Sequence, residues 1–502
     1  MADVAIPAGK EMLINYKPVG IAGTNSGQIV LNSVQKIDFE KHFNYLLRYP
    51  YGCLEQTISA AFPQLYLSKA DKENYKYRQK AQENVQIALS KLFSFQTVDG
   101  LFALWPNSIN NDLYVSMYSL HFMIEAQRMG YTVNSKMLNR LVEAIHKAVY
   151  NISIEDRGRR NGDIVAYYYY LSTISPEVKN AAYNMEFGTY QPNKLSNFGL
   201  SLFCLSNYFG ATCTYAEQLQ KGLYSDNDYR NYYYGGKLRN WSILLMDAVN
   251  RKDETTARSF HSLIAKEIEQ STYYNTQSIA WVLNAVNKYY NWLGNPKTFS
   301  ASITNTSGNA NSTEINGVFN YLYAISNANQ AQQYSFKNTG KSTIYLMLKG
   351  TGISAVGKEQ AMTKNLSLSI QYIDINGNEL DVTRLKTGTR FEAVVNIRPE
   401  NIVSPANNMV LNYRLPAGWE IRNMSIEADA SYNPFPGSTR SDLRDDRLFI
   451  HFVANPGAQL QFRIPLVASY VGKFNMPSSK VEDMYDPNLY AQTAGKAITI
   501  LP

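Results

Sequence analysis

The chain has 502 residues, of which 45% are hydrophobic and 18% are charged, so it is too long for a single core and should fold into about two to four domains. Its formal net charge is +7, but lysine and arginine are spread thinly and form no basic stripe, which argues against a nucleic-acid-binding surface. No apolar run reaches the length of a membrane span, and the first residues lack the basic and apolar regions of a signal peptide.

The beginning of the chain is predicted to form β-strands. Polar and apolar residues alternate over Met12–Tyr16 and Gln28–Asn32, and the Gly-rich segment Gly20–Gly27 between them is typical of a turn. From Phe39 onward the apolar residues recur with helical spacing, which indicates a helical block.

A short stretch behind the first helical pattern carries the chemistry, and it reads Tyr49-Pro50-Tyr51-Gly52-Cys53-Leu54-Glu55-Gln56. Pro50 cannot continue a helix and Gly52 can adopt a turn conformation, so a new helix is predicted to begin at Cys53. One helical turn then brings the thiol of Cys53 and the carboxamide of Gln56 onto the same face, and the helix N-terminus stabilises a thiolate. Attack of the thiolate on the carboxamide would expel ammonia and give an internal thioester. From the spacing alone, an inert buried cysteine beside an ordinary glutamine is the alternative.

With its flanking residues, Pro-Tyr-Gly-Cys-Leu-Glu-Gln resembles the thioester motif of alpha-2-macroglobulins and complement components, in the form typical of bacterial alpha-2-macroglobulins. The segments Gly100–Pro106 and Tyr114–Tyr118 are similar to the second hairpin of the thioester domain in that family, and Tyr274–Ala280 is similar to its last inner helix. The resemblance implies a thioester between Cys53 and Gln56. Glu55 is expected to support the motif by orienting the site or by capping the helix.

Helical periodicity continues to about Trp292. Short connections between the segments favour antiparallel helix pairs. About twelve helices, or six hairpins, are expected, which is the number that closes an α/α toroid. Helices are predicted near 74–96, 112–129, 135–149, 162–174, 192–208, 237–250, 254–268 and 274–292, with weaker segments near 176–186 and 212–222.

Strand patterns return after Lys297. They cover Thr298–Thr304, Gly317–Tyr323 and Ser342–Leu348. Because strands precede and follow the helical block, residues 1–36 and 296–357 are interpreted as two parts of one CUB-like β-sandwich, interrupted by the toroid of residues 37–295, as the family resemblance implies.

The last part of the chain, residues 358–502, is predicted to be an immunoglobulin-like macroglobulin β-sandwich. The fold class is therefore multidomain α and β, with an α/α toroid inserted in one sandwich and a second sandwich behind it. Strands are predicted near 366–374, 391–398, 407–414, 446–453, 459–468 and 495–501.

The resemblance extends to this last domain, where Leu415–Ile421, Arg444–Arg447 and Ser479–Pro487 look like segments of bacterial members. In those members a tyrosine four residues before the thioester cysteine and a methionine of the terminal domain shield the bond from water. The matching residues are Tyr49 and Met484, and their neighbours Tyr51 and Tyr485 are expected to add to the shield. Ordinary packing between domains is the alternative role for Met484.

The absence of a histidine indicates which group is expected to attack the thioester. In complement-like members a histidine in the loop after an inner helix takes over the acyl group, but the comparable loop here, Asn151–Gly162, has none. The sequence contains no histidine between His146 and His261. The resemblance thus implies direct aminolysis by lysine amines, and His146 is interpreted as a structural residue of an amphipathic helix.

The cysteines and histidines indicate neither a metal site nor a cofactor, because their spacing matches no ligand pattern. Cys204 and Cys213 either pair in a disulfide or remain two separate buried thiols, and separate thiols are the favoured interpretation. Cys53 stays outside such a pair in both cases.

These features predict the thioester-containing part of a bacterial alpha-2-macroglobulin, a single-use protease inhibitor and not an enzyme with turnover. The expected partners are target proteases, through their lysine amines, and upstream macroglobulin and bait regions of a longer protein. That protein is expected to be a monomer in the periplasm or cell envelope, anchored to the membrane. The alternatives are a polysaccharide lyase or glycosidase, and a papain-like hydrolase, for which Cys53 needs a histidine partner.

Overall fold

The chain divides into two compact units, residues 37–295 and residues 1–36 with 296–502. The computed structural model describes residues 4–37, 52–66, 75–152, 159–183, 185, 195–208, 213, 236–270, 276–294, 297–307, 311–353, 355, 357, 359–422, 435–486 and 488–502.

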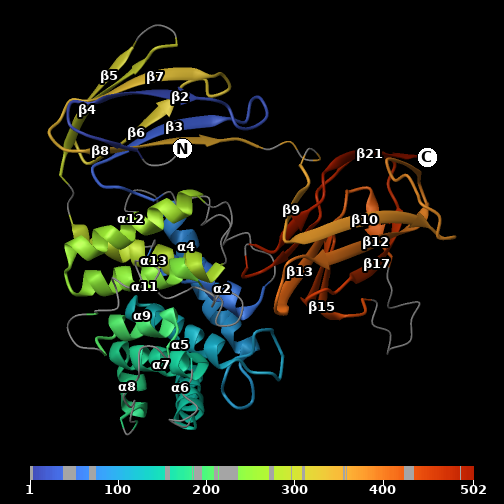
Figure 1. Ribbon diagram of the computed structural model, residues 1–502, viewed down its shortest axis with the longest axis horizontal. Helices are drawn as coiled ribbons and strands as arrows, with labels where there is room; N and C mark the ends of the chain where they lie inside the picture. The colour runs from blue at the N-terminus through green and yellow to red at the C-terminus, as the bar shows by residue number, and fades with distance from the viewer. Residues whose placement is uncertain are drawn as a thin grey trace. The chain divides into compact units, whose positions relative to one another are not determined.

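The first β-sandwich is assembled from two stretches that are far apart in sequence. Its two antiparallel sheets have the strand orders β1-β8-β3-β6 and β2-β7-β4-β5. In Figure 1 the early strands, coloured blue, lie among the late strands, coloured yellow. This confirms the predicted sandwich that is interrupted by the helical block. The strands are β1 (Val4–Ile6), β2 (Glu11–Tyr16), β3 (Ser26–Asn32), β4 (Phe299–Asn305), β5 (Ser312–Val318), β6 (Asn320–Ile325), β7 (Gln332–Asn338) and β8 (Ile344–Thr351).

Alternation explains which face of each strand is buried. In β4 the side chains of Phe299, Ala301 and Ile303 are buried while the residues between them are partly exposed, as a period of two requires. The prediction of one strand over Gly317–Tyr323 is wrong, because the chain turns there from β5 into β6. Gly317 has a φ of +67°, a conformation that favours glycine, and forms a β-bulge near the end of β5, directly before this turn.

The other unit is an α/α toroid. Its helices are α2 (Leu54–Ala61), α4 (Tyr75–Lys91), α5 (Leu113–Arg128), α6 (Ser135–Tyr150), α7 (Arg159–Ile174), α8 (Pro176–Ala181), α9 (Asn197–Leu205), α11 (Lys237–Asn250), α12 (Glu254–Gln270) and α13 (Thr276–Leu293), with a short 3₁₀ turn, η1 (Leu92–Phe95), after α4.

The burial of these helices separates an inner from an outer set. Helices α5, α9, α11 and α13 are buried around most of their circumference, whereas α6 buries one stripe, including Leu138, Leu141 and Ile145, and exposes the rest. Among the described helices, α2, α5, α7, α9, α11 and α13 each contact the next, and α13 contacts α2 again. The inner helices therefore form a closed ring.

The predicted helices agree with this ring, with three differences. The segment predicted near 74–96 ends as η1, the helix near 192–208 is shorter, and the predicted loop Asn151–Gly162 ends in the first turn of α7. The first helical pattern after Phe39 and the weak segment near 212–222 lie outside the described residues. No described helix is long and apolar enough to cross a membrane.

Cys204 and Cys213 form a disulfide, with their Cα atoms 5.3 Å apart, so the interpretation as two separate thiols is wrong. Cys204 lies at the end of α9, and the turn after this helix brings Phe203 and Tyr208 into a ring stack with centroids 4.1 Å apart. The sequence spacing of the two cysteines did not reveal this turn.

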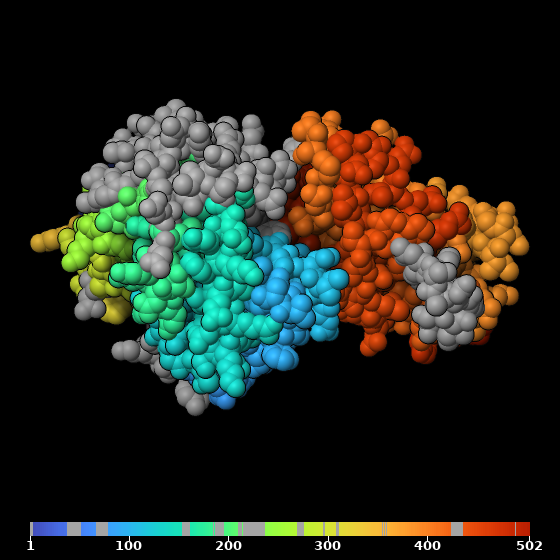
Figure 2. Space-filling model, turned by 90° about the horizontal axis from the view of Figure 1, so that it is seen from below, coloured from blue at the N-terminus to red at the C-terminus, as the bar shows by residue number. Residues whose placement is uncertain are grey.

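The terminal β-sandwich has its own core and two main sheets, of strand orders β10-β12-β17-β14 and β15-β16-β13-β19-β20-β9, with a small sheet β11-β21-β18. Strands β10, β12 and β17 lie side by side in Figure 1, and in Figure 2 the orange and red side chains of this sandwich form a continuous packed surface. The strands are β9 (Met362–Lys364), β10 (Leu366–Asp374), β11 (Arg384–Lys386), β12 (Arg390–Pro399), β13 (Ala406–Arg414), β14 (Trp419–Ile421), β15 (Ser438–Arg444), β16 (Arg447–Ala454), β17 (Leu460–Ala468), β18 (Gly472–Met476), β19 (Lys480–Asp483), β20 (Tyr490–Gln492) and β21 (Lys496–Leu501).

Candidate functional site

Helix α2 begins directly after Cys53, where the sequence predicts a helix start. Gly52 has a φ of +69°, in the left-handed region that glycine adopts most readily. Cys53 is the N-cap residue, with an extended backbone, and its carbonyl accepts the N–H of Thr57 at 3.0 Å. The N–H of Leu54 donates to the carbonyl of Leu104 at 2.9 Å, outside the helix. The backbone therefore fixes the start of α2 from both sides.

Cys53 and Gln56 occupy the N-cap and N3 positions of this helix. In a capping box the side chains at these two positions fold toward one another, each reaching the backbone of the other residue. Here the N-cap carries a thiol and the N3 side chain ends in a carboxamide, and Cys53 makes no side-chain capping hydrogen bond, so the likeness to a capping box is one of position. The relative exposure of Cys53 is 0% and that of Gln56 is 4%. The thiol and the carboxamide are thus on one helical turn and away from bulk water.

Such an arrangement is suited to acyl transfer from nitrogen to sulfur. The N-terminus of a helix favours negative charge, which stabilises the thiolate that must attack the carboxamide carbon. A high-energy acyl bond that forms there persists only if water is excluded, and the burial of both side chains provides this exclusion.

Glu55, between these two residues, points its carboxylate into the interior of the ring. Ser59, one turn later on α2, donates to Oε1 at 2.5 Å, and Thr276 at the start of α13 donates to the carboxylate at 2.9 and 3.1 Å. The hydroxyl of Tyr118 on α5 lies 3.1 Å from that of Ser59. Because the Ser59 proton is directed to Glu55, Tyr118 acts as the donor in this pair. Burial, and then the charge of Glu55, raises the pKa of Tyr118 and keeps it protonated.

A second polar cluster lies next to the first. Gln277, the residue after Thr276, accepts through Oε1 from the hydroxyl of Tyr114 at 2.7 Å and from Arg239 at 3.2 Å. Arg239 on α11 also stacks on Phe198, with its guanidinium carbon 3.8 Å from the ring centroid. Burial raises the pKa of Tyr114, and the guanidinium of Arg239 opposes this rise.

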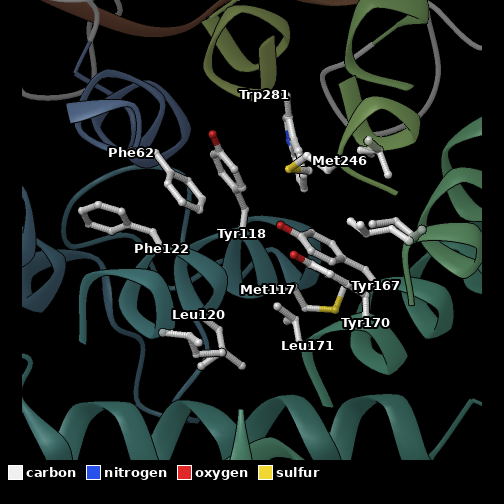
Figure 3. Packing of buried hydrophobic residues seen from close by; sticks show 14 of the residues in the cluster. Phe62, Met117, Tyr118, Leu120, Phe122, Tyr167, Tyr170, Leu171, Met246 and Trp281 are labelled. Atoms are coloured by element: carbon white, nitrogen blue, oxygen red, sulfur yellow. The ribbon is translucent and has the colours of Figure 1, made fainter. Parts of the chain in front are cut away.

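An aromatic cluster packs inside the toroid and includes Tyr118. Tyr118 packs beside Phe62, with centroids 5.8 Å apart, and Tyr167 packs beside Trp281, with centroids 6.4 Å apart (Figure 3). His121 belongs to this cluster and its Nδ1 lies 3.0 Å from the Tyr167 hydroxyl. Burial lowers the pKa of His121 to about 3, so its ring is a neutral core group.

The other two histidines in the described part of the toroid are also held by tyrosines. His146 lies 3.1 Å from the Tyr168 hydroxyl, and His261 lies 3.1 Å from that of Tyr290. The structural interpretation of His146 agrees with this contact. A papain-like hydrolase requires a histidine base beside Cys53. The contacts described for His121, His146 and His261 do not include Cys53.

The structure brings Cys53, Glu55 and Gln56 together on one turn, whereas Tyr49 and Tyr51 lie outside the described residues. Met484 and Tyr485 follow β19 in the other unit. There the carboxylate of Asp483 accepts the N–H groups of Tyr485 at 2.8 Å and Asp486 at 3.0 Å, and the N–H of Met484 donates to the carbonyl of Asn408 at 3.0 Å. These hydrogen bonds fix the backbone of the loop that carries the two expected shielding residues.

Sequence reasoning missed the residues around Glu55. Two signals were available, namely the helical spacing of Glu55 with Ser59 and of Tyr114 with Tyr118, which places each pair on one face. The roles of Arg239 and Thr276 had no such signal, because each depends on which helices become neighbours when the ring closes.

Two family models match the chain. Residues 24–147 match the A-macroglobulin TED domain, and residues 366–488 match the bacterial alpha-2-macroglobulin MG10 domain. Together with the toroid and the two sandwiches, these matches define the class of the macroglobulins.

Sequence relatives and solved structures agree on a narrower group. Alpha-2-macroglobulin of Rickettsia conorii is 23% identical over 89% of this chain and 24% of its own length, and that of Escherichia coli is 34% identical over 27% of this chain and 8% of its own length. The native Escherichia coli alpha-2-macroglobulin structure from domain MG7 to the C-terminus has a TM-score of 0.76 at 18% identity, covering 100% of this chain and 81% of that one. A Salmonella alpha-2-macroglobulin structure reacted with methylamine has a TM-score of 0.75 at 18% identity, covering 100% and 33%.

The chain belongs to the bacterial alpha-2-macroglobulin family. It spans about a quarter of the length of the curated relatives that it matches over most of its own length. The toroid and sandwich that suggested a carbohydrate-active enzyme are accounted for by this family.

Proposed function

We propose that this chain is the thioester-bearing part of a bacterial alpha-2-macroglobulin, an inhibitor that captures attacking endopeptidases covalently through Cys53 and Gln56. The observation that carries this proposal is the burial of both side chains at the N-cap and N3 positions of one helix. The family match also supports the proposal, because the model that matches residues 24–147, which include Cys53 and Gln56, is that of a TED domain.

The bond forms by an exchange that balances within the chain. The thiolate of Cys53 attacks Cδ of Gln56, the carbon–nitrogen bond breaks, and the nitrogen takes a proton and leaves as ammonia. In the capture step a lysine amine of the protease attacks the same carbon, an amide bond forms, and Cys53 regains its thiol. Each acyl group reacts once, so the protein is a single-use inhibitor and not an enzyme.

An amine is the expected nucleophile because the sequence offers no histidine between His146 and His261 to receive the acyl group first. The related Salmonella protein is described as reacted with methylamine, a small primary amine. A protein lysine presents the same group.

Shielding of the thioester is assigned to Tyr49 and Tyr51 on the chain before Cys53 and to Met484 and Tyr485 in the terminal sandwich. Aromatic and thioether side chains exclude water without supplying a nucleophile. The hydrogen bonds to the carboxylate of Asp483 support the shielding role of Met484 and Tyr485, because they fix the backbone of the loop that carries both residues.

The proposed protein is exported to the periplasm or cell envelope, is anchored to the membrane there and acts as a monomer. The disulfide between Cys204 and Cys213 supports an oxidising compartment. Upstream macroglobulin and bait regions, which the longer relatives have room for, are the proposed sensor of the attacking protease.

Intact mass spectrometry of the native chain tests the proposal. The expected mass is lower than that of the sequence by one ammonia, Cys53 is not alkylated, and methylamine adds its full mass while making Cys53 alkylable. The Cys53→Ala variant is the control, with the full mass and no methylamine adduct. A native chain of full mass whose Cys53 is alkylated at once would overturn the proposal.

A further inference from the structure

Two of the buried charged residues on the inner helices, Glu55 on α2 and Arg239 on α11, carry opposite charges. The relative exposure of Glu55 is 0% and that of Arg239 is 3%. Removing a charge from water is strongly unfavourable unless hydrogen bonds and an opposite charge compensate it. Both residues therefore require an explanation beyond ordinary packing.

The residues that contact Glu55 and those that contact Arg239 are neighbours along the chain. Thr276, which donates to Glu55, precedes Gln277, which accepts from Arg239. Tyr118, which contacts Ser59, lies one helical turn after Tyr114, which donates to Gln277. The hydroxyls of both tyrosines are within the electrostatic influence of both charges. Two hydrogen-bonded clusters, joined through neighbouring residues on α5 and α13, thus connect α2, α5, α11 and α13 where the ring closes.

We propose that Glu55 and Arg239 are the two ends of one charge-balanced network that fixes the orientation of α2, and that Ser59, Tyr118 and Thr276 act through it as positioning residues for the reaction of Cys53 with Gln56. This inference rests on the proposed thioester. It goes beyond it by assigning the acyl transfer a supporting set of residues that lie on other helices.

The position of Glu55 on α2 explains how the network reaches the reacting pair. Glu55 lies between Cys53 and Gln56 in the first turn, so a carboxylate held by α13 and, through Ser59, by α5 keeps that turn from unwinding. Unwinding would move the carboxamide of Gln56 relative to the thiol, and a misplacement of about 1 Å in an intramolecular reaction costs ~100-fold in rate.

The first experiment measures how fast the thioester forms. Ammonia attacks the acyl group of Gln56 and regenerates carboxamide and thiol, so the mass deficit disappears and returns when ammonia is removed. In the full chain, Glu55→Gln is expected to slow this return by ~10- to 100-fold. Thr276→Val, which keeps both charges and removes one donor, is the second variant in case Glu55→Gln does not fold.

Asp247→Asn provides the matched control. Asp247 is a buried carboxylate on α11, the helix of Arg239, and its partner is Arg251 at 2.7 Å. Its substitution removes a buried charge from the toroid but leaves α2 untouched, so the thioester should return at the wild-type rate. A return at the wild-type rate in both Glu55→Gln and Thr276→Val would overturn the positioning role.

The second experiment measures charge balance without any thioester. In a Cys53→Ala background, amide hydrogen exchange of the α2 peptide reports the opening of this helix. Glu55→Gln and Arg239→Met should each accelerate exchange, because each leaves one buried charge without its counterpart. If the two effects were independent, the exchange rate of the double variant would rise by the product of the two single effects. We expect it to be at least ~10-fold slower than that product.

The two experiments separate this inference from the proposed function. A wild-type chain without a mass deficit contradicts the thioester, while the exchange cycle still tests the network. Effects on exchange that multiply independently would show that Glu55 and Arg239 are not coupled and would overturn the inference, even where the mass deficit is present.

Discussion

The hydroxyl of Thr276 donates to the carboxylate of Glu55, with Oγ1 2.9 Å from Oε2 and 3.1 Å from Oε1, across 221 residues of sequence. This contact joins the first described inner helix to the last one, so the carboxylate beside the reacting pair also closes the ring. Substitutions of Thr276 and Glu55 therefore test how the closure of the ring affects the site.

Substitution of Thr276 should separate its hydrogen bond from its packing. Thr276→Val keeps the shape but removes the donor to a buried carboxylate, and we expect a loss of about 1.5 to 3 kcal/mol in the unfolding free energy of the toroid. Thr276→Ser keeps the donor and should lose less than half of that. Thermal unfolding followed by circular dichroism measures both, and equal losses in the two variants would contradict the role of the hydroxyl.

Substitution of Gly52 should act through backbone conformation alone. Its φ is +69° and a Cβ there would have no atom within 4 Å, so Gly52→Ala is expected to cost about 1 to 2 kcal/mol and to shift the entry into α2. Urea unfolding gives the cost, and intact mass gives the fraction of chains with a thioester. Gly130→Ala is the control, because Gly130 has a φ of +90° in equally open space at the end of α5. It should cost as much stability and leave the mass deficit complete.

The disulfide predicts a specific pattern of thiol labelling. After methylamine treatment under denaturing, non-reducing conditions, only Cys53 should be alkylated, and reduction should expose Cys204 and Cys213 as well. Cys204→Ser with Cys213→Ser should lower the unfolding free energy by about 2 to 3 kcal/mol, since the closed loop is short. Labelling of all three cysteines in protein from an oxidising compartment, before reduction, would contradict the pairing.

Asp483 predicts a pH dependence of stability. Burial raises the pKa of its carboxyl to about 6 from an ordinary value of 3.8. The folded chain therefore binds this proton more tightly than the unfolded chain, and the stabilisation by the protonated acid is complete below pH 4 and is lost as pH rises through 6. The shift corresponds to about 3 kcal/mol.

Asp483→Asn tests this dependence, because an amide keeps an oxygen for the N–H groups of Tyr485 and Asp486. The difference in unfolding free energy between variant and wild type, measured by urea at pH 4 and pH 8, should shift by about 3 kcal/mol in favour of the variant at high pH. Asp381→Asn is the control with the opposite sign, because hydrogen bonds from Thr383 lower the pKa of that exposed carboxyl. A difference that does not change with pH would contradict the prediction for Asp483.

Long helices and long strands were predictable because their apolar period repeats several times. Helix α11 was predicted with its observed bounds, and β10 likewise, whereas β7 was missed because its sequence, QQYSFKN, is mostly polar. Strands as short as β14 and β20, three residues each, give no period at all. They exist because longer neighbours pair with them, which no local pattern encodes.

The candidate site divides in the same way. Local spacing predicted that Cys53, Glu55 and Gln56 share one helical turn, and the helix start after Gly52 agrees with it. The remote partners were not predictable from spacing, since the contact of Glu55 with Thr276 depends on closure of the ring. The reactive role of Cys53 and Gln56 remains a prediction that the experiments above address. The shielding roles of Tyr49, Tyr51, Met484 and Tyr485 also remain predictions.

The contact between α2 and α13 can form only after the ribosome has synthesised the chain between them. If Glu55 must contact Thr276 before α2 is fixed, the ribosome has to add 221 further residues after Glu55, which takes ~10 to 40 s at bacterial elongation rates. Under the proposed function, the thiol of Cys53 and the carboxamide of Gln56 stay unreacted during that interval. The proposed acyl bond would then be present only in chains whose toroid is complete.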